Sequence, residues 1–165
     1  MTARIEVTDF TGSDMDIAWV PALVEGVFQG ENRVKDLDRG VHVALVNDAE
    51  IRRLNEQFHQ KDSPTDVLSF PLVAEEESEG AWDPDGEGPM AELVVSVDTA
   101  RREADQRGLT LKSELALYLV HGVLHLIGYD DMDEVARERM RKAEIRHLSA
   151  AGYPPDVFST RGGES

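Results

Sequence analysis

The sequence of 165 residues contains no cysteine. This absence excludes disulfide bonds and thiolate metal sites, so any bound metal ion must be held by histidine, aspartate or glutamate. A chain without cysteine also fits a reducing cytosol.

Long hydrophobic runs are absent as well. The longest nearly apolar run covers residues 115–127 and contains two histidines. It is too short to cross a bilayer, because a membrane-spanning helix needs about 20 apolar residues. The first residues, MTARIEVTDF, lack the apolar core of a signal peptide. We therefore expect a soluble, cytoplasmic protein with no membrane partner.

Basic residues are scarce. The chain has 17 lysines and arginines against 33 acidic residues, and its net charge is −16. Because phosphate binding needs a basic surface, this balance argues against a nucleic-acid partner. The charge is uneven, however. Residues 74–89 carry seven acids and no base among glycines and prolines, which is typical of an acidic mobile loop. Bases gather elsewhere, including Arg101 and Arg102, so the sequence leaves room for a local basic face.

The spacing of apolar residues predicts four strands with helices between and after them. The strands are expected at residues 4–10, 41–46, 66–70 and 91–98. The helices are expected over about 14–29, 48–58, 99–107, 110–127 and 133–150. This order predicts an α/β (or α+β) fold with one mixed, roughly four-stranded sheet flanked by helices. We expect a single small domain over residues 1–155, followed by a flexible tail at 156–165.

Several polar residues are candidate helix caps. Asp14 or Asp16 could begin the first helix, in which Pro21 would then cause a kink or a split. Asp98 or Thr99 could cap the helix after the last strand, and Thr110 could open the next one.

The stretch HGVLHLIGYDD, residues 121–131, has the pattern of a metal-binding helix. His121 and His125 are four residues apart, so they share one helix face at a Cβ separation of roughly 5–6 Å. Gly128 can end the helix and turn the chain back, which makes Asp131 the candidate third ligand. The spacing is similar to that of the metalloprotease metal helix of metzincins, H-E-x-x-H-x-x-G-x-x-H.

Other interpretations of this stretch stay open. The histidine pair could be structural, and Asp131 could cap the final helix. Gly122 stands where a peptidase has the glutamate that activates water, so a zinc peptidase is only a remote alternative. If a divalent metal ion is bound, zinc suits two histidines and a carboxylate best, with nickel, manganese or iron as alternatives.

Three segments resemble the YbeY family of bacterial metal-dependent endoribonucleases and rRNA maturation factors. HGVLHLIGYDD resembles the family signature H-G-x-L-H-L-x-G-Y-D-H. LNEQFHQKDSPTDVLSFP, residues 54–71, and ELVVSVDTARREA, residues 92–104, resemble two further family motifs in the same order along the chain. The resemblance covers about residues 40–150.

The resemblance implies a small α/β domain that binds one zinc-like ion through three histidines. It also implies a single-strand-specific endoribonuclease that acts in 16S rRNA 3′-end maturation and ribosome quality control. Its partners would be rRNA, the small ribosomal subunit and assembly proteins, and not DNA. An alternative from another class is a ribosome-assembly factor with attenuated or no nuclease activity and a structural metal.

The metal ligands implied by the resemblance include one departure from the family. The third family histidine falls on Asp131, so the expected ligands are His121, His125 and Asp131. Aspartate is a competent zinc ligand. Its charge would lower the Lewis acidity of the ion relative to three imidazoles. Asp130 could compete for the same ion.

A second departure affects the expected substrate contacts. The family arginine of the R-x-K-D segment falls on His59, which becomes a candidate acid–base residue or extra ligand, or a solvated loop residue. Lys61, Arg101 and Arg102 are candidates for holding the RNA backbone. The family's Gly-Asp before the last strand is Ala91-Glu92 here, which keeps an acid. Three polar residues could simply make turn and strand hydrogen bonds: Thr65, Asp66 and Ser69.

Overall fold

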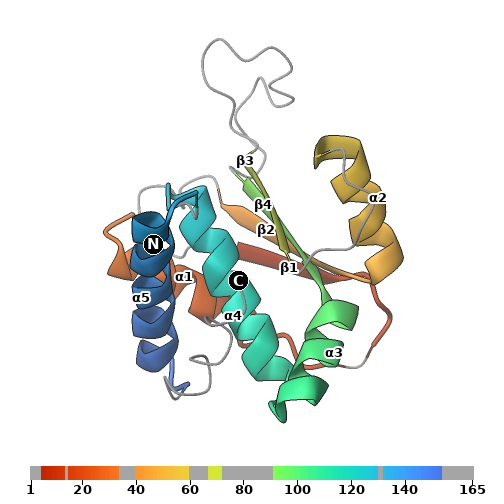
Figure 1. The fold of residues 1–165 in the computed structure, drawn as a ribbon. Coiled ribbons are helices and arrows are strands. Elements are labelled where there is room, and N and C mark those ends of the chain that lie inside the picture. Colours follow the sequence, from red (N-terminus) through yellow and green to blue (C-terminus); the bar gives the residue numbers. More distant parts are fainter. Residues whose placement is uncertain are drawn as a thin grey trace.

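The computed structural model describes residues 5–13, 15–33, 40–59, 67–71, 91–129 and 132–153. Within these residues the chain forms one four-stranded sheet with helices on both faces (Figure 1). The strands are β1 (Ile5–Asp9), β2 (Val41–Val46), β3 (Val67–Pro71) and β4 (Ala91–Ser96). The helices are α1 (Val20–Gly30), α2 (Asp48–His59), α3 (Val97–Arg107), α4 (Leu111–Leu126) and α5 (Glu134–Ala150). The expected α/β fold with helices around a mixed sheet is confirmed.

The sheet has the strand order β1-β2-β4-β3. The first three of these strands are parallel, and β3 pairs antiparallel with β4. The registers of β2 and β4 run together from Val41 opposite Ala91 to Val46 opposite Ser96. Their carboxyl ends therefore meet at one edge of the sheet, where α2 and α3 begin.

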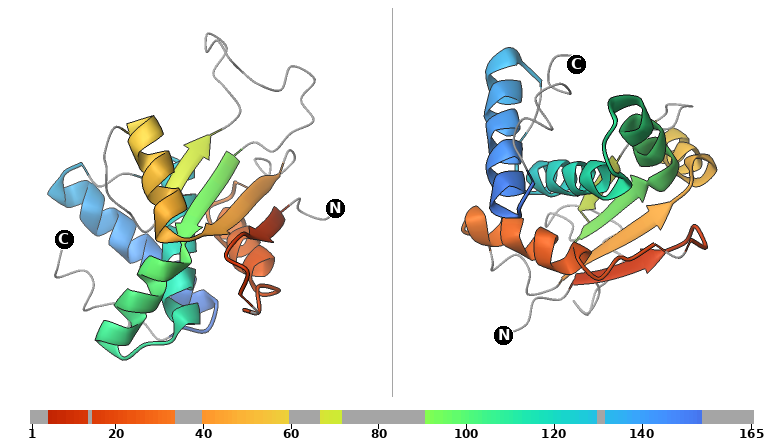
Figure 2. Two further views of the ribbon diagram at one scale, coloured as in Figure 1. Left: turned by 90° about the vertical axis from the view of Figure 1, so that its right-hand side faces the viewer. Right: turned by 90° about the horizontal axis from the view of Figure 1, so that it is seen from below.

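The two faces of the sheet are covered unequally, as the views in Figure 2 show. Alternate residues of the strands, such as Leu45 and Leu93, join α1, α4 and α5 in the main hydrophobic core. The opposite face carries a small cluster in which Val46 and Val94 pack against Ile51 of α2. Because successive strand residues point to opposite faces, this arrangement follows from the nearly continuous apolar runs of β2 and β4.

The predicted starts of α1 and α3 were wrong. Helix α1 begins at Val20, with Pro21 in its first turn, where the missing amide hydrogen of proline is tolerated. Pro21 therefore starts this helix instead of kinking it, and Asp16 instead accepts a hydrogen bond from the Ala18 amide at 3.0 Å. Asp14 lies outside the described residues.

Strand β4 also ends earlier than expected. Ser96 is the N-cap of α3 and accepts a hydrogen bond from the Thr99 amide, a role expected of Asp98 or Thr99. Thr110 caps α4 as predicted, through the Ser113 amide.

Two segments predicted from the sequence are not among the described residues. The acidic loop at 74–89 and the tail at 156–165 lie outside the described residues. Among the helices that are described, none has the length and apolarity needed to cross a bilayer.

Candidate metal centre

The two histidines of α4 converge. The Nε2 atoms of His121 and His125 lie 3.0 Å apart, and the rings meet edge to face with their centroids separated by 4.6 Å. Both side chains are only partly buried, unlike the core residues around them. The prediction that i and i+4 histidines share one face is confirmed.

The Nδ1 atoms of both rings have acceptors outside the pair. The Glu144 carboxylate of α5 accepts from His121 Nδ1, and the carbonyl oxygen of Tyr129 accepts from His125 Nδ1 at 3.1 Å. A carbonyl oxygen can only accept, so Nδ1 of His125 carries the hydrogen and Nε2 of the neutral ring keeps a lone pair. The same reasoning applies to His121 beside an ionised carboxylate.

Two Nε2 atoms at 3.0 Å are compatible either with a hydrogen bond from a protonated ring to a neutral one or with two lone pairs that share a cation. Acceptors that fix the outer nitrogen of each ring are the usual support of metal-ligating histidines. The donor set and its outer hydrogen bonds therefore fit a bound divalent ion.

The turn after α4 has the predicted form. Gly128 has φ +115°, and the Tyr129 amide donates to the Leu124 carbonyl at 2.9 Å, which closes the helix. Asp130 and Asp131 lie outside the described residues. In the described part of the chain, no group of three histidines, aspartates or glutamates could hold an ion. Asp131 thus stays a prediction.

The first turn of α5 bears on the alternative reading of Asp131. Asp133 is the N-cap of α5, and its carboxylate accepts from the Ala136 amide at 2.8 Å. The capping role considered for Asp131 is thus filled by Asp133.

Gly122 lets α4 lie directly on the sheet. A Cβ at this position would be 2.9 Å from Cδ2 of Leu93 and 3.0 Å from Cγ2 of Val67. The Ser69 hydroxyl donates to the Gly122 carbonyl at 3.0 Å, which confirms the hydrogen-bonding reading of Ser69. Since no side chain fits here, the water-activating glutamate of a zinc peptidase has no place on this helix. Thr65 and Asp66 lie outside the described residues.

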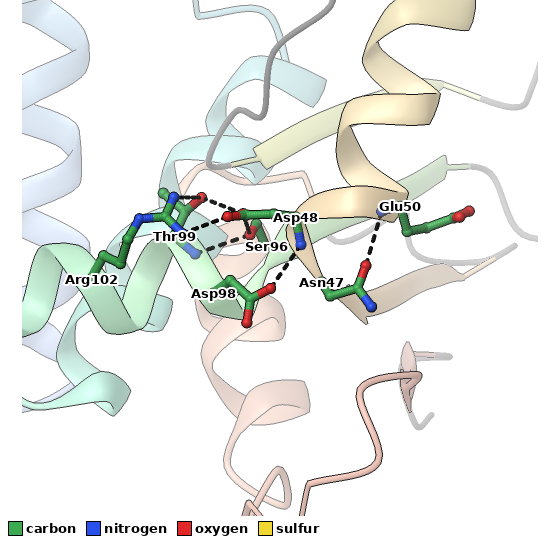
Figure 3. Close-up of polar contacts among 7 residues, drawn as sticks. All are labelled: Asn47, Asp48, Glu50, Ser96, Asp98, Thr99 and Arg102. Carbon is green, nitrogen blue, oxygen red and sulfur yellow. Dashed lines mark hydrogen bonds and ion pairs between the residues drawn. The ribbon is translucent and has the colours of Figure 1, made fainter.

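Arg102 belongs to a different cluster, shown in Figure 3. Asp48, in the first turn of α2, accepts from the Ser96 hydroxyl at 2.7 Å, from the Thr99 hydroxyl at 2.9 Å and from Arg102. Burial alone would raise the pKa of Asp48, but the hydrogen bonds from Ser96, Arg102 and Thr99 hold it below the ordinary value of 3.8. This cluster joins α2 to α3 at the carboxyl edge of the sheet.

The predicted substrate contacts are therefore not all brought to the histidine pair. Arg102, on α3, pairs with Asp48 of α2. Helix α3 lies beside one end of α4, whereas α5 lies beside the other (Figure 2). Arg101 is exposed, and no ion pair joins it to another described residue. His59 is the last residue of α2, but its side chain, like all of Lys61, lies outside the described part.

Glu92 is also separate from the histidine pair. Its carboxylate lies 2.6 Å from Nδ1 of His42, and Nε2 of His42 lies 2.9 Å from the Thr8 hydroxyl. This row crosses β4, β2 and β1 on the face that carries α2, because Glu92 and His42 have the same parity as Val94 and Ala44.

Sequence reasoning missed two residues near the histidine pair. Glu144 contacts His121 from 23 residues away, and no local pattern marks it. Arg139 is exposed and lines a hollow of about 230 Å³ beside the turn after α4, together with Ile127, Gly128, Tyr129 and Ala136.

The sequence profile of the family described as Endoribonuclease YbeY matches residues 8–152. The chain belongs to this family. It is 35% identical over 157 residues to Endoribonuclease YbeY of Bacillus licheniformis, covering 92% of this chain and 97% of that protein. It is 42% identical over 113 residues to Endoribonuclease YbeY of Sphingopyxis alaskensis, covering 68% and 67% of the two chains.

A solved structure has the same overall fold as this chain. The solution structure of a Thermotoga maritima protein is 27% identical and matches with a TM-score of 0.52 over 98% of this chain and 96% of that one. The resemblance of the three motifs to the YbeY family is thus confirmed at the level of the whole domain.

Proposed function

We propose that this chain is a metal-dependent endoribonuclease that cleaves single-stranded RNA. The observation that carries the proposal is the convergence of two histidine Nε2 atoms at 3.0 Å on the signature helix of a chain that belongs to the YbeY family. The relatives named above are called endoribonucleases, which supports RNA as the substrate.

In the proposed site, His121, His125 and Asp131 hold one divalent ion, and zinc suits this set best. Asp131 follows Tyr129 by two residues in the sequence, and the Tyr129 carbonyl accepts from His125 Nδ1, so the proposal takes its third ligand from the chain directly after a contact of the pair. The bound ion would supply Lewis acidity to a phosphate oxygen and lower the pKa of a water molecule.

The protein groups around the pair have distinct tasks in this proposal. Glu144 and the Tyr129 carbonyl keep the hydrogens on Nδ1, so both Nε2 atoms stay available. Arg139, beside the turn after α4, binds a phosphate of the RNA backbone by charge, whereas Arg101 on α3 would meet the RNA farther from the pair, and Lys61 adds to this binding. His59, in place of the family arginine, acts as an acid or base near the scissile phosphate.

The biological setting is proposed from the family. The RNA is the 3′ end of 16S rRNA, processed during its maturation and in ribosome quality control. The small ribosomal subunit and its assembly proteins are then the partners, and the activity is expected in the cytoplasm. The net charge of −16 would confine RNA to local basic surfaces, so we expect weak binding to RNA outside this context.

The proposal is tested with purified protein, zinc analysis and cleavage of matched single-stranded and duplex RNA. We expect about one zinc per chain and cleavage of the single strand. His121→Ala and Asp131→Ala should lose both, while His42→Ala, a histidine on the other face of the sheet, should keep both. Stoichiometric zinc together with full cleavage in Asp131→Ala would remove Asp131 from the site.

The double variant Asp131→His with His59→Arg separates an active nuclease from an assembly factor of weak or lost activity. Under the proposal the native chain already cleaves RNA, and the double variant changes the rate only moderately. If the native chain binds zinc but does not cleave, and the double variant does, the native protein is an assembly factor with a structural metal.

A further inference from the structure

Tyr129 connects the histidine pair to the end of helix α1. Its hydroxyl donates to Oε1 of Glu31 at 2.9 Å, and its carbonyl accepts from Nδ1 of His125 at 3.1 Å. One residue of the turn is thus fixed by its side chain on one side and orients an imidazole with its backbone on the other.

Glu31 is itself firmly held. Arg146 and His147 of α5 each lie 2.6 Å from its Oε2, so both carboxylate oxygens have partners. Its side chain is only 14% exposed. Burial would raise the pKa of Glu31, but the hydrogen bonds from His147, Tyr129 and Arg146 lower it below the ordinary value, so the group is charged near neutral pH.

Helices α1 and α5 pack tightly next to Glu31. A Cβ on Gly30 would lie 2.6 Å from Cε1 of His147, so the last turn of α1 and α5 pack without space for a methyl group. Arg33 adds a second link, since it donates to the Ile127 carbonyl at 3.1 Å. The turn over 127–129 is therefore hydrogen-bonded at both ends to residues at and just after the end of α1.

We infer that Glu31 and Tyr129 are positioning residues of the metal centre. They fix the turn that orients His125 and from which the chain continues to Asp131. This inference rests on the proposed metal site. Loss of hydrogen bonds that support metal ligands typically lowers metal affinity about 10–100-fold, because ligands that are not held must be ordered when the ion binds.

Helix α5 supports both imidazoles under this assignment. Glu144 reaches His121 directly, whereas His147, one turn later on the same helix face, acts on His125 through Glu31 and Tyr129. The two routes share no residue, so their effects on metal affinity should be separable.

The first test is Tyr129→Phe, which removes only the hydroxyl. We expect the zinc affinity, measured by competition with a fluorescent chelator, to fall about tenfold or more, with faster zinc release. The urea stability of the metal-free protein should change far less than the affinity. Tyr153→Phe, the same change beyond the end of α5, should leave zinc affinity unaltered. Unchanged affinity in Tyr129→Phe overturns the inference.

The second test is a double-mutant cycle that combines Tyr129→Phe with Glu31→Ala. Because both changes remove the same hydrogen bond, the double variant should bind zinc about as weakly as Glu31→Ala alone, and additive losses would contradict the inference. The variant His121→Ala shows whether a negative result concerns the metal site itself or only the role of Tyr129. If it binds zinc like the native chain, the proposed metal site itself is wrong, whereas loss of zinc only in His121→Ala leaves that site intact and overturns the role of Tyr129.

Discussion

The imidazoles of His121 and His125 face each other through their Nε2 atoms at 3.0 Å, and both rings are held from behind at Nδ1. A tetrahedral ion with metal–nitrogen distances near 2.1 Å separates two ligand nitrogens by about 3.4 Å. The pair therefore needs only a few tenths of an ångström of opening to bind zinc. Binding of the proposed ion would therefore need little further ordering of these two side chains.

Zinc should stabilise the folded protein. A ligand that binds only the native state adds about 2.7 kcal/mol when its free concentration is 100 times Kd. We expect urea unfolding of the native chain to shift to higher urea on addition of zinc. His42→Ala should respond in the same way, and His121→Ala should not respond. An equal shift in all three would mean that zinc binds elsewhere.

Glu144 should matter through its acceptor oxygen more than through its charge. Glu144→Ala removes the acceptor of His121 Nδ1, so we expect a fall in zinc affinity of about 10–100-fold. Glu144→Gln keeps a carbonyl oxygen that can accept the same hydrogen bond and should recover much of this loss. The measurement is chelator competition. Equal affinity in the alanine variant and the native chain would count against the support role.

Adding a methyl group should have opposite effects at two helical glycines. Gly122→Ala places Cβ against Leu93 and Val67, and overpacking typically costs about 1–3 kcal/mol, which exceeds or cancels the helix-propensity gain of about 1 kcal/mol. A Cβ on Gly26 of α1 would have no atom within 4 Å, so Gly26→Ala should stabilise the folded protein by roughly 0.5–1 kcal/mol. Urea unfolding of both variants decides this. Stabilisation by Gly122→Ala would show that α4 can move away from the sheet.

Asp48 should make the protein sensitive to acid. Its pKa in the folded state is below the ordinary 3.8, so its contribution to stability is present above that pH and is lost as the pH falls through the folded pKa. We expect Asp48→Asn to be less stable than the native chain at neutral pH and to lose less stability on acidification. Urea unfolding as a function of pH measures both slopes. Parallel slopes would show that Asp48 titrates alike in both states.

Substitution of Arg139 should affect RNA binding, whereas substitution of Arg102 should affect stability. Arg139→Ala should weaken binding of single-stranded RNA and reduce the salt dependence of binding by about one phosphate contact, with little change in stability. Arg102→Ala removes a contact between α2 and α3, so it should lower stability and leave RNA affinity nearly unchanged. Salt titrations of RNA affinity beside urea unfolding distinguish them. The reverse pattern would restore Arg102 as the substrate contact.

The spacing of residues in the sequence predicted the part of the candidate site that is built from residues close together in the chain. His121, His125 and Gly128 lie on one helix end, where the period of 3.6 residues fixes which side chains meet. Glu144 and Glu31 could not be found in this way, because they reach the site from 23 and 98 residues away through the packing of helices. Arg101 and Arg102 are equivalent in sequence, and only the docking of α2 decides that Arg102 meets Asp48.

The position of α5 in the chain has a consequence for when the two imidazoles of α4 become oriented. The histidines of α4 are synthesised before α5, which carries Glu144, Arg146 and His147. A growing chain that has not yet packed α5 thus lacks Glu144, the acceptor of His121 Nδ1, and also lacks Arg146 and His147, which hold Glu31. The orientation of His121 and the attachment of Glu31 are in this way tied to the packing of α5, the last of the described helices.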